Sequence, residues 1–162
     1  MAGGLKGNWN VELPRLIGQV EQLASKGFRL NLNKRLGLQG LQLVKSGFRS
    51  STAPDGAPWA AVLRGGKPLR DTGRLGNSFT LDVTSRGFII GTNVSYAGTH
   101  QSGARISAKT AKWLTFRIGK EWARKKSVVI PARPMLPEGD LPPKWNQAFE
   151  TVILKAWDDL WR

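Results

Sequence analysis

The sequence predicts an α+β fold, with two helices in the N-terminal part, a small antiparallel β-sheet in the middle and an amphipathic helix at the C-terminal end. Three observations lead to this class. Apolar residues recur every three or four positions in both terminal parts, they alternate with polar residues in the middle, and prolines and glycines gather between these regions. With 162 residues the chain is long enough for one domain. We expect a single domain made of a helical part (10–50), a loop and β core (51–136) and a C-terminal helix (137–162).

The first expected helix covers Asn10–Lys26, where apolar residues at spacings of three and four form one stripe. Proline is tolerated in the first turn of a helix but not in its interior. Pro14 therefore predicts that the helix begins near Glu12 or Leu13. Gly27 is expected to end it.

Residues 28–51 are expected to form a second, longer helix with a weaker pattern. Gly37 and Gly40 each cost about 1 kcal/mol in a helix interior, so they mark either the close approach of another backbone or a break. The apolar residues form two adjacent faces, and we favour burial of both within the chain over contact of one with another molecule. One face holds Leu30, Gly37, Leu41, Val44 and Phe48, and the other holds Leu32, Leu36 and Leu43.

A loop rich in proline and glycine, residues 52–76, follows this helix. Proline fixes φ and glycine reaches conformations closed to other residues, so the loop has a defined shape. Trp59 follows a proline and lies among small apolar residues, and we expect it in the core. Asp71 or Thr72 is expected to accept hydrogen bonds from the backbone amides of residues 73–75.

Residues 79–90 are expected to form a β-hairpin, because apolar and polar residues alternate over the first half and a Ser-Arg-Gly turn follows. The hairpin is expected to end at residues 91–93. Residues 94–101 then suit a short helix, capped by Asn93 or Ser95.

The stretch 104–126 is basic and its periodicity is ambiguous. Within it, residues 107–118 fit either a helix or a long hairpin. Residues 127–130 form a short apolar segment typical of a strand, which the prolines of residues 131–134 end. Residues 142–161 carry one apolar stripe at helical spacing and begin with prolines, so they predict an amphipathic helix.

The net charge is +14, from 25 basic and 11 acidic residues. Two long stretches, 23–53 and 84–119, contain no acid at all. A field of this size favours anionic partners such as nucleic acid, a membrane surface or an acidic protein, and the alternative is a solvated basic surface. No apolar run is long enough to span a bilayer, and no apolar segment of the secretory type follows residues 1–7. We therefore expect no membrane partner.

The sequence offers little for catalysis. It has no cysteine and one histidine, His100, which argues against thiol nucleophiles and against zinc or iron sites. The sequence contains no Gly-x-Ser-x-Gly motif of the kind that carries the nucleophile in many serine hydrolases. Residues 64–67 lack the spacing of a phosphate-binding loop. The pair Asp158-Asp159 suits a solvated helix face better than acid–base chemistry. We expect no enzyme, no metal, no cofactor and no small-molecule substrate, and we expect His100 to form structural hydrogen bonds at the end of its short helix.

Basic residues mixed with Trp113, Phe116 and Trp122 suit the binding of a nucleic-acid backbone with stacking on its bases. The alternative, which we favour, is that these aromatic residues lie in the core and that the basic residues form a solvated face. The candidate nucleic-acid-facing residues are Lys109, Lys112, Arg117, Lys120, Arg124, Lys125 and Lys126.

The prolines, glycines and polar residues also follow a recognisable order. The pieces are Ser51–Trp59, Pro68–Leu75, the hairpin that ends at Gly91–Asn93, the segment Tyr96–Gly103, and Ile130–Pro134 ahead of the last helix. This order, over about residues 48–136, resembles the Mu-like phage virion morphogenesis (tail completion) family. The chain departs from the family pattern at Ser102 and in the long basic stretch after Gly103.

The resemblance implies a structural protein of the phage head–tail junction (neck) or of the tail end, which completes the tail or joins it to the head and has no catalytic residues. It implies a place in the virion after assembly in the host cytoplasm. The implied partners are further copies in a ring (a hexamer, or alternatively a dodecamer), neighbouring connector and tail proteins, and DNA passing through. The rival interpretation is a basic nucleic-acid-binding module. The residues that carry the resemblance, called the marker residues below, are Pro54, Asp55, Gly56, Trp59, Leu69, Asp71, Thr72, Gly73, Leu75, Tyr96, His100, Gln101, Pro131, Arg133 and Pro134.

Overall fold

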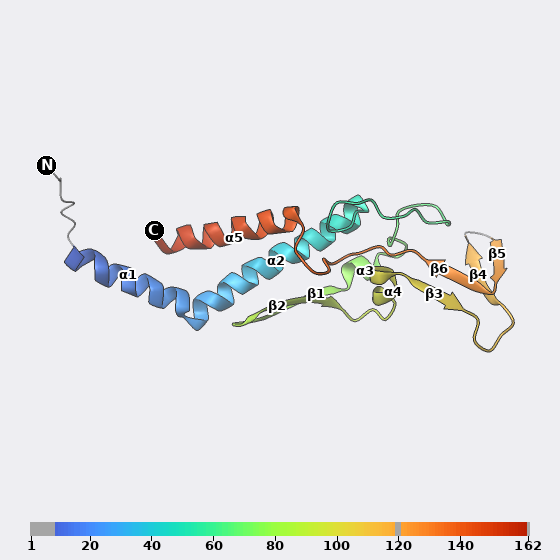
Figure 1. The fold of residues 1–162 in the computed structure, drawn as a ribbon, viewed down its shortest axis with the longest axis horizontal. Helices are drawn as coiled ribbons and strands as arrows, with labels where there is room; N and C mark the ends of the chain where they lie inside the picture. Colours follow the sequence, from blue (N-terminus) through green and yellow to red (C-terminus); the bar gives the residue numbers. More distant parts are fainter. Residues whose placement is uncertain (1–8, 119–120, 162) are drawn as a thin grey trace.

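The computed structural model describes residues 9–118 and 121–161 and shows an elongated molecule built along one long helix (Figure 1). That helix, α2, has a β-hairpin along one side and the last helix, α5, along the other. The elements in order are α1 (Trp9–Ala24), α2 (Lys26–Ser50), α3 (Arg74–Asn77), β1 (Phe79–Thr84), β2 (Gly87–Thr92), α4 (Ala97–Ser102), β3 (Ala104–Ser107), β4 (Leu114–Ile118), β5 (Glu121–Lys125), β6 (Ser127–Ile130) and α5 (Pro143–Trp161). This arrangement confirms the predicted α+β class. No helix in these two ranges is long and apolar enough to cross a membrane.

The break between α1 and α2 lies at Ser25, and not at Gly27 as the sequence predicts. The hydroxyl of Ser25 accepts a 3.0 Å hydrogen bond from the amide of Phe28, so Ser25 caps α2 and Gly27 falls within its first turn. The predicted start of α1 is also wrong, because the helix begins at Trp9 and continues through Pro14. Since proline has no N–H, α1 lacks one backbone hydrogen bond there.

The apolar faces of α2 are covered within the chain over most of their length, as expected, but Leu30 near the start of the helix is 43% exposed. A Cβ atom added at Gly40 would lie 2.7 Å from Cδ1 of Ile90 in β2 and 3.5 Å from Cζ of Phe149 in α5. A Cβ at Gly37 would likewise meet the side chain of Leu81 in β1. The two glycines therefore admit side chains of the hairpin and of α5, rather than another backbone, and α2 is unbroken.

The strands form three separate antiparallel pairs, β1–β2, β3–β6 and β4–β5. In the first pair Phe79 lies opposite Thr92 and Thr84 opposite Gly87, which confirms the predicted hairpin. The ambiguous segment 107–118 contains no helix. It holds the end of β3, a loop, and β4, which pairs antiparallel with β5.

The short helix α4 begins at Ala97, three residues later than predicted, and neither Asn93 nor Ser95 caps it. Tyr96 occupies the cap position and makes no capping side-chain bond. The residues before it are held differently, because the amide of Val94 donates to the hydroxyl of Thr92 at 3.2 Å.

The main core lies around the C-terminal end of α2, where the loop, the hairpin, α4 and the start of α5 meet. The rings of Phe48 and Trp59 pack edge to face with centroids 5.4 Å apart, and Phe79 lies 5.8 Å from Phe48. Trp59 is 7% exposed, so its predicted place in the core is confirmed. The remaining buried members of this core are Val44, Leu75, Val94, Ala97, Met135 and Trp145.

Candidate functional site

Marker residues from three distant segments meet next to this core, and we call the contact between them the clamp. It joins Trp59 of the loop, His100 and Gln101 of α4, and Arg133 and Pro134, which follow β6. The indole Nε1 of Trp59 donates to the carbonyl oxygen of Pro134 at 2.8 Å. The backbone amide of Arg133 donates to the carbonyl oxygen of His100 at 2.6 Å. The clamp thus ties the segment after β6 to both the loop and α4.

Arg133 is the buried cation of the clamp and is only 5% exposed. Its Nε donates to the carbonyl oxygen of Ala60 at 2.8 Å, and its Nη2 donates to that of Ala61 at 3.0 Å. No carboxylate pairs with it among the described residues. Burial lowers the pKa of Arg133 from its ordinary value, and the two carbonyl oxygens offset part of the desolvation cost. The sequence marks Arg133 only by its place between prolines, so its contact with the loop could not be anticipated.

Gln101 binds the segment after β6 from α4, and both the oxygen and the nitrogen of its side-chain amide take part. Its Oε1 accepts hydrogen bonds from the amides of Met135 (2.8 Å) and Leu136 (3.2 Å). Its Nε2 donates to the carbonyl oxygen of Leu136 at 2.8 Å and to the carboxylate of Glu138 at 3.0 Å. Gln101 therefore satisfies backbone groups of an irregular segment that has no strand to pair with.

The sequence predicts structural hydrogen bonds from the side chain of His100, but the hydrogen bond that His100 makes in the clamp is accepted by its backbone carbonyl oxygen. Its ring packs edge to face on Tyr96, with centroids 5.9 Å apart. Its Nδ1 is buried and has no hydrogen-bond partner among the described residues. Burial, and secondarily the positive charge of Arg133, lower the pKa of His100 below its ordinary 6.5. Both effects favour the neutral form of the ring.

A cavity of about 460 Å³ lies beside the clamp, and residues of the second marker piece, Pro68–Leu75, line part of it. Tyr96, His100 and Arg133 line one part of it. The other lining residues come from the loop and α3, and they are Val62, Arg64, Leu69, Asp71, Thr72, Gly73, Arg74 and Leu75. Eight marker residues thus share one cavity, although they come from three separate segments of the sequence.

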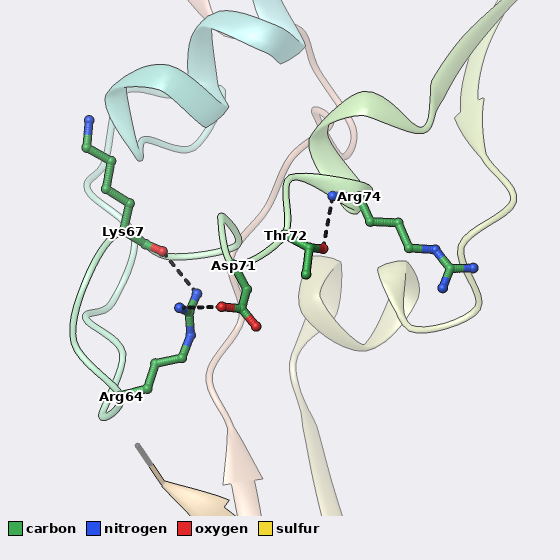
Figure 2. A network of polar contacts seen from close by, with 5 residues as sticks. All are labelled: Arg64, Lys67, Asp71, Thr72 and Arg74. Atoms are coloured by element: carbon green, nitrogen blue, oxygen red, sulfur yellow. Dashed lines mark hydrogen bonds and ion pairs between the residues drawn. The ribbon is translucent and has the colours of Figure 1, made fainter. Parts of the chain in front are cut away.

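Figure 2 shows the polar contacts at the rim of this cavity, which resolve the two capping alternatives. The hydroxyl of Thr72 accepts a 3.3 Å hydrogen bond from the amide of Arg74, the first residue of α3, whereas the cap position is Gly73, which has no side chain to cap the helix. Asp71 instead forms an exposed ion pair with Arg64 at 3.1 Å. Arg64 also donates to the carbonyl oxygen of Lys67 at 3.3 Å, which closes the loop on itself.

The remaining marker residues lie outside this cavity. Asp55 forms a local turn, in which its Oδ1 accepts from the amide of Ala57 at 2.9 Å. Gly56 follows with a φ of +93°, a value that favours glycine. Pro54 and Gly56 border a small pocket beside the start of α5, and Pro131 borders a groove next to β6.

Except for Lys120, which lies outside the described residues, the candidate nucleic-acid-facing residues lie at the end of the molecule farthest from α1, on and around the β4–β5 hairpin (Figure 1). Trp122 is 72% exposed and Trp113 is 41% exposed, so the favoured prediction that these aromatic residues are core is wrong for both. The reason is that β4 and β5 pair only with each other and lie outside the main core. Lys109 and Lys112 precede β4, Arg117 is in β4, Arg124 and Lys125 are in β5, Lys126 follows it, and Lys120 lies outside the described residues.

Nothing in the described ranges groups three or more histidine, aspartate or glutamate side chains as a metal site would require. The comparisons with known proteins give one result. A model of the phage virion morphogenesis family matches residues 14–156, which include every marker residue. No curated protein and no solved structure matches the chain significantly. Because the family model covers most of its length, the chain belongs to the phage virion morphogenesis family.

Proposed function

We propose that this protein is a structural component of the phage neck, where copies of it form a closed ring around the DNA path and complete the tail or join it to the head. The family match supports a structural role in virion assembly. The observation that carries the proposal further is the clamp. Its marker residues bind mainly backbone groups of other segments, so the features that characterise the chain serve to fix its shape.

The proposal includes no catalytic role. The functional groups of Arg133 and Gln101 are engaged with backbone carbonyls and amides. His100, which is the best candidate for a general base, lies beside an arginine and has no carboxylate bonded to its ring in the described structure. A protein that holds neighbours together needs a defined shape and surfaces for contact, and the clamp and the exposed apolar residues of α1 and α5 support such a role.

Apolar surface for such contacts lies on two helices at the end of the molecule opposite the β4–β5 hairpin (Figure 1). On α1, Ile17 is 52% exposed and Val20 is 63% exposed. On α5, Ile153 is 46% exposed and Leu154 is 65% exposed. Two different apolar patches on one subunit suit head-to-tail contacts, which close into a ring when the rotation per subunit divides a full turn. We favour a hexamer, with a dodecamer as the alternative.

A complementation experiment in the phage tests this function. Particles made without the protein should show heads and tails that are unjoined or tails that are incomplete, and the wild-type gene should restore them. Val20→Asp places a charge in the α1 patch and should prevent restoration, whereas Gln22→Asp, an exposed polar position on the same helix, should not. Normal particles without the protein would refute the proposal, and equal restoration by both variants would refute the use of α1 as a contact.

A further inference from the structure

The pairing of β4 with β5 sorts their side chains onto two faces. Arg117 lies opposite Trp122, and Thr115 lies opposite Arg124. Because side chains alternate along a strand and paired residues share a face, these four residues form one face, called the outer face below. All four are exposed, whereas Leu114, Phe116, Ile118 and Ala123 on the opposite face are half-buried.

The outer face lies within a concentration of unpaired positive charge. The described residues around the hairpin include six cations, Lys109, Lys112, Arg117, Arg124, Lys125 and Lys126, and one acid, Glu121. Glu121 lies opposite Ile118 and Lys125 lies opposite Leu114, so both belong to the other face, and the outer face itself carries Arg117 and Arg124. The ion pairs within the described ranges join Arg35 to Asp159 and Arg64 to Asp71, and neither includes a hairpin cation. Close positive charges without counter-charges repel one another, and a polyanion removes that repulsion.

Trp122 distinguishes this face from a surface that merely aids solubility. It is 72% exposed, with Arg117 across the ladder and Arg124 two residues along the same strand. By contrast, the other exposed indole of this region, Trp113, has the ammonium group of Lys126 at 5.7 Å from its ring centroid. A large aromatic side chain between two arginines offers apolar contact to a sugar and an N–H donor to a phosphate oxygen.

We propose that the outer face of the β4–β5 hairpin binds the phosphate backbone of duplex DNA. This inference rests on the proposed function, because it makes the hairpin the element of the ring that faces the DNA path. Three features favour DNA over an acidic protein. The cations are dense, the outer face itself carries a single exposed aromatic residue, Trp122, and a two-stranded β-ribbon has a width that the major groove accepts. A single free indole is too little for a base-stacking platform, so duplex is favoured over single-stranded nucleic acid.

A salt titration of binding to a short duplex of arbitrary sequence tests the proposal with the full-length protein. The double variant Arg117→Ala/Arg124→Ala should weaken binding and reduce the slope of log K against log salt by about two, since each lost phosphate contact removes about one. The matched control is Arg29→Ala/Lys45→Ala, which removes the same charge from exposed positions on α2 and should leave the slope unchanged. Trp122→Ala should weaken binding without changing the slope, and Trp122→Phe should retain more of it.

Three results would overturn the proposal. The first is an equal loss of binding in the hairpin and control variants, which would mean binding by the whole basic surface. The second is tighter binding of a single strand of equal length, and the third is tighter binding of polyglutamate, which stands for an acidic protein partner. Native mass spectrometry of the same variants separates this inference from the proposed function. An intact ring without duplex binding refutes the DNA contact alone, whereas the absence of any ring refutes the neck assignment.

Discussion

The indole of Trp59 and the carbonyl of Pro134 are 75 residues apart in the sequence and are joined by a 2.8 Å hydrogen bond. The bond connects the first and the last marker pieces, and the ring of Trp59 also packs against Phe48 of α2. One side chain therefore holds three parts of the fold in register, and its removal is the most direct way to test the clamp.

Trp59→Ala should lower the free energy of unfolding by about 3–5 kcal/mol, because a buried aromatic side chain leaves a cavity that the core fills only partly. Trp59→Phe keeps most of the packing and loses the bond to Pro134, so it should cost less. Leu63→Ala is the control, since Leu63 is 86% exposed and should change stability little. Urea unfolding measures all three. A small effect of Trp59→Ala would show that the clamp does not hold the fold.

Gln101→Ala should destabilise the protein by about 2–4 kcal/mol, because the amides of Met135 and Leu136 lose their acceptor at a partly buried site. Gln101→Glu retains an acceptor but places a second carboxylate beside Glu138. It should therefore be less damaging, and part of its cost should disappear at low pH. Gln42→Ala, at an exposed position of α2, serves as the control in the same unfolding assay. Equal effects of the two alanine variants would contradict the assigned contacts.

Gly103→Ala and Gly56→Ala separate backbone strain from steric clash. Both glycines have positive φ, +74° and +93°, so alanine is strained at either position. A Cβ at Gly103 would also lie 2.9 Å from the backbone nitrogen of Ala132, whereas nothing lies within 4 Å at Gly56. We expect Gly103→Ala to lower the melting temperature clearly more than Gly56→Ala. A reversed order would mean that β6 can move away from α4 at little cost.

The stability of the protein should depend on pH through its single histidine. Burial and Arg133 lower the pKa of His100 in the folded chain, so the unfolded chain binds a proton more readily. The free energy of unfolding should therefore decrease as the pH falls through 6.5 toward the lower folded pKa. Melting curves between about pH 7.5 and 5.5 should show this decrease in the wild type and a smaller one in His100→Gln. Parallel pH profiles of the two proteins would contradict the assignment.

Thr72→Ala should cost about 1 kcal/mol, since it removes the hydroxyl that accepts from the amide of Arg74. Asp71→Ala should cost less, because the side chain of Asp71 is 78% exposed and its ion pair with Arg64 is screened by solvent. Chemical denaturation of the two variants decides between them. A larger loss for Asp71→Ala would show that closure of the loop by Arg64 matters more than the turn.

Much of the fold follows from local sequence patterns. The alternation from Phe79 to Thr84 gives a hairpin, and the apolar stripe after Pro142 gives α5. Where two local signals compete, the prediction fails. Ser25 caps α2 more effectively than Gly27 stops α1, because its hydroxyl satisfies a free amide that glycine cannot.

The sequence identifies the residues of the candidate site as family markers, but it does not predict which of them contact one another. Their contacts join residues 59, 101 and 133–136, and no periodicity relates such distant positions. The exposure of Trp122 could not be predicted either, because an aromatic residue in an alternating strand is usually buried. Whether β4–β5 packs on the core depends on tertiary contacts that the local pattern does not contain.

An image of the assembled particle at subunit resolution would decide whether copies of this chain form the ring that we propose at the head–tail junction. We expect a closed ring of identical subunits between head and tail. In that ring α1 and α5 should lie at subunit contacts, and the β4–β5 hairpins should point toward the DNA path. Particles that lack the protein at the junction, or that hold it there only as separate monomers, would refute the proposed ring.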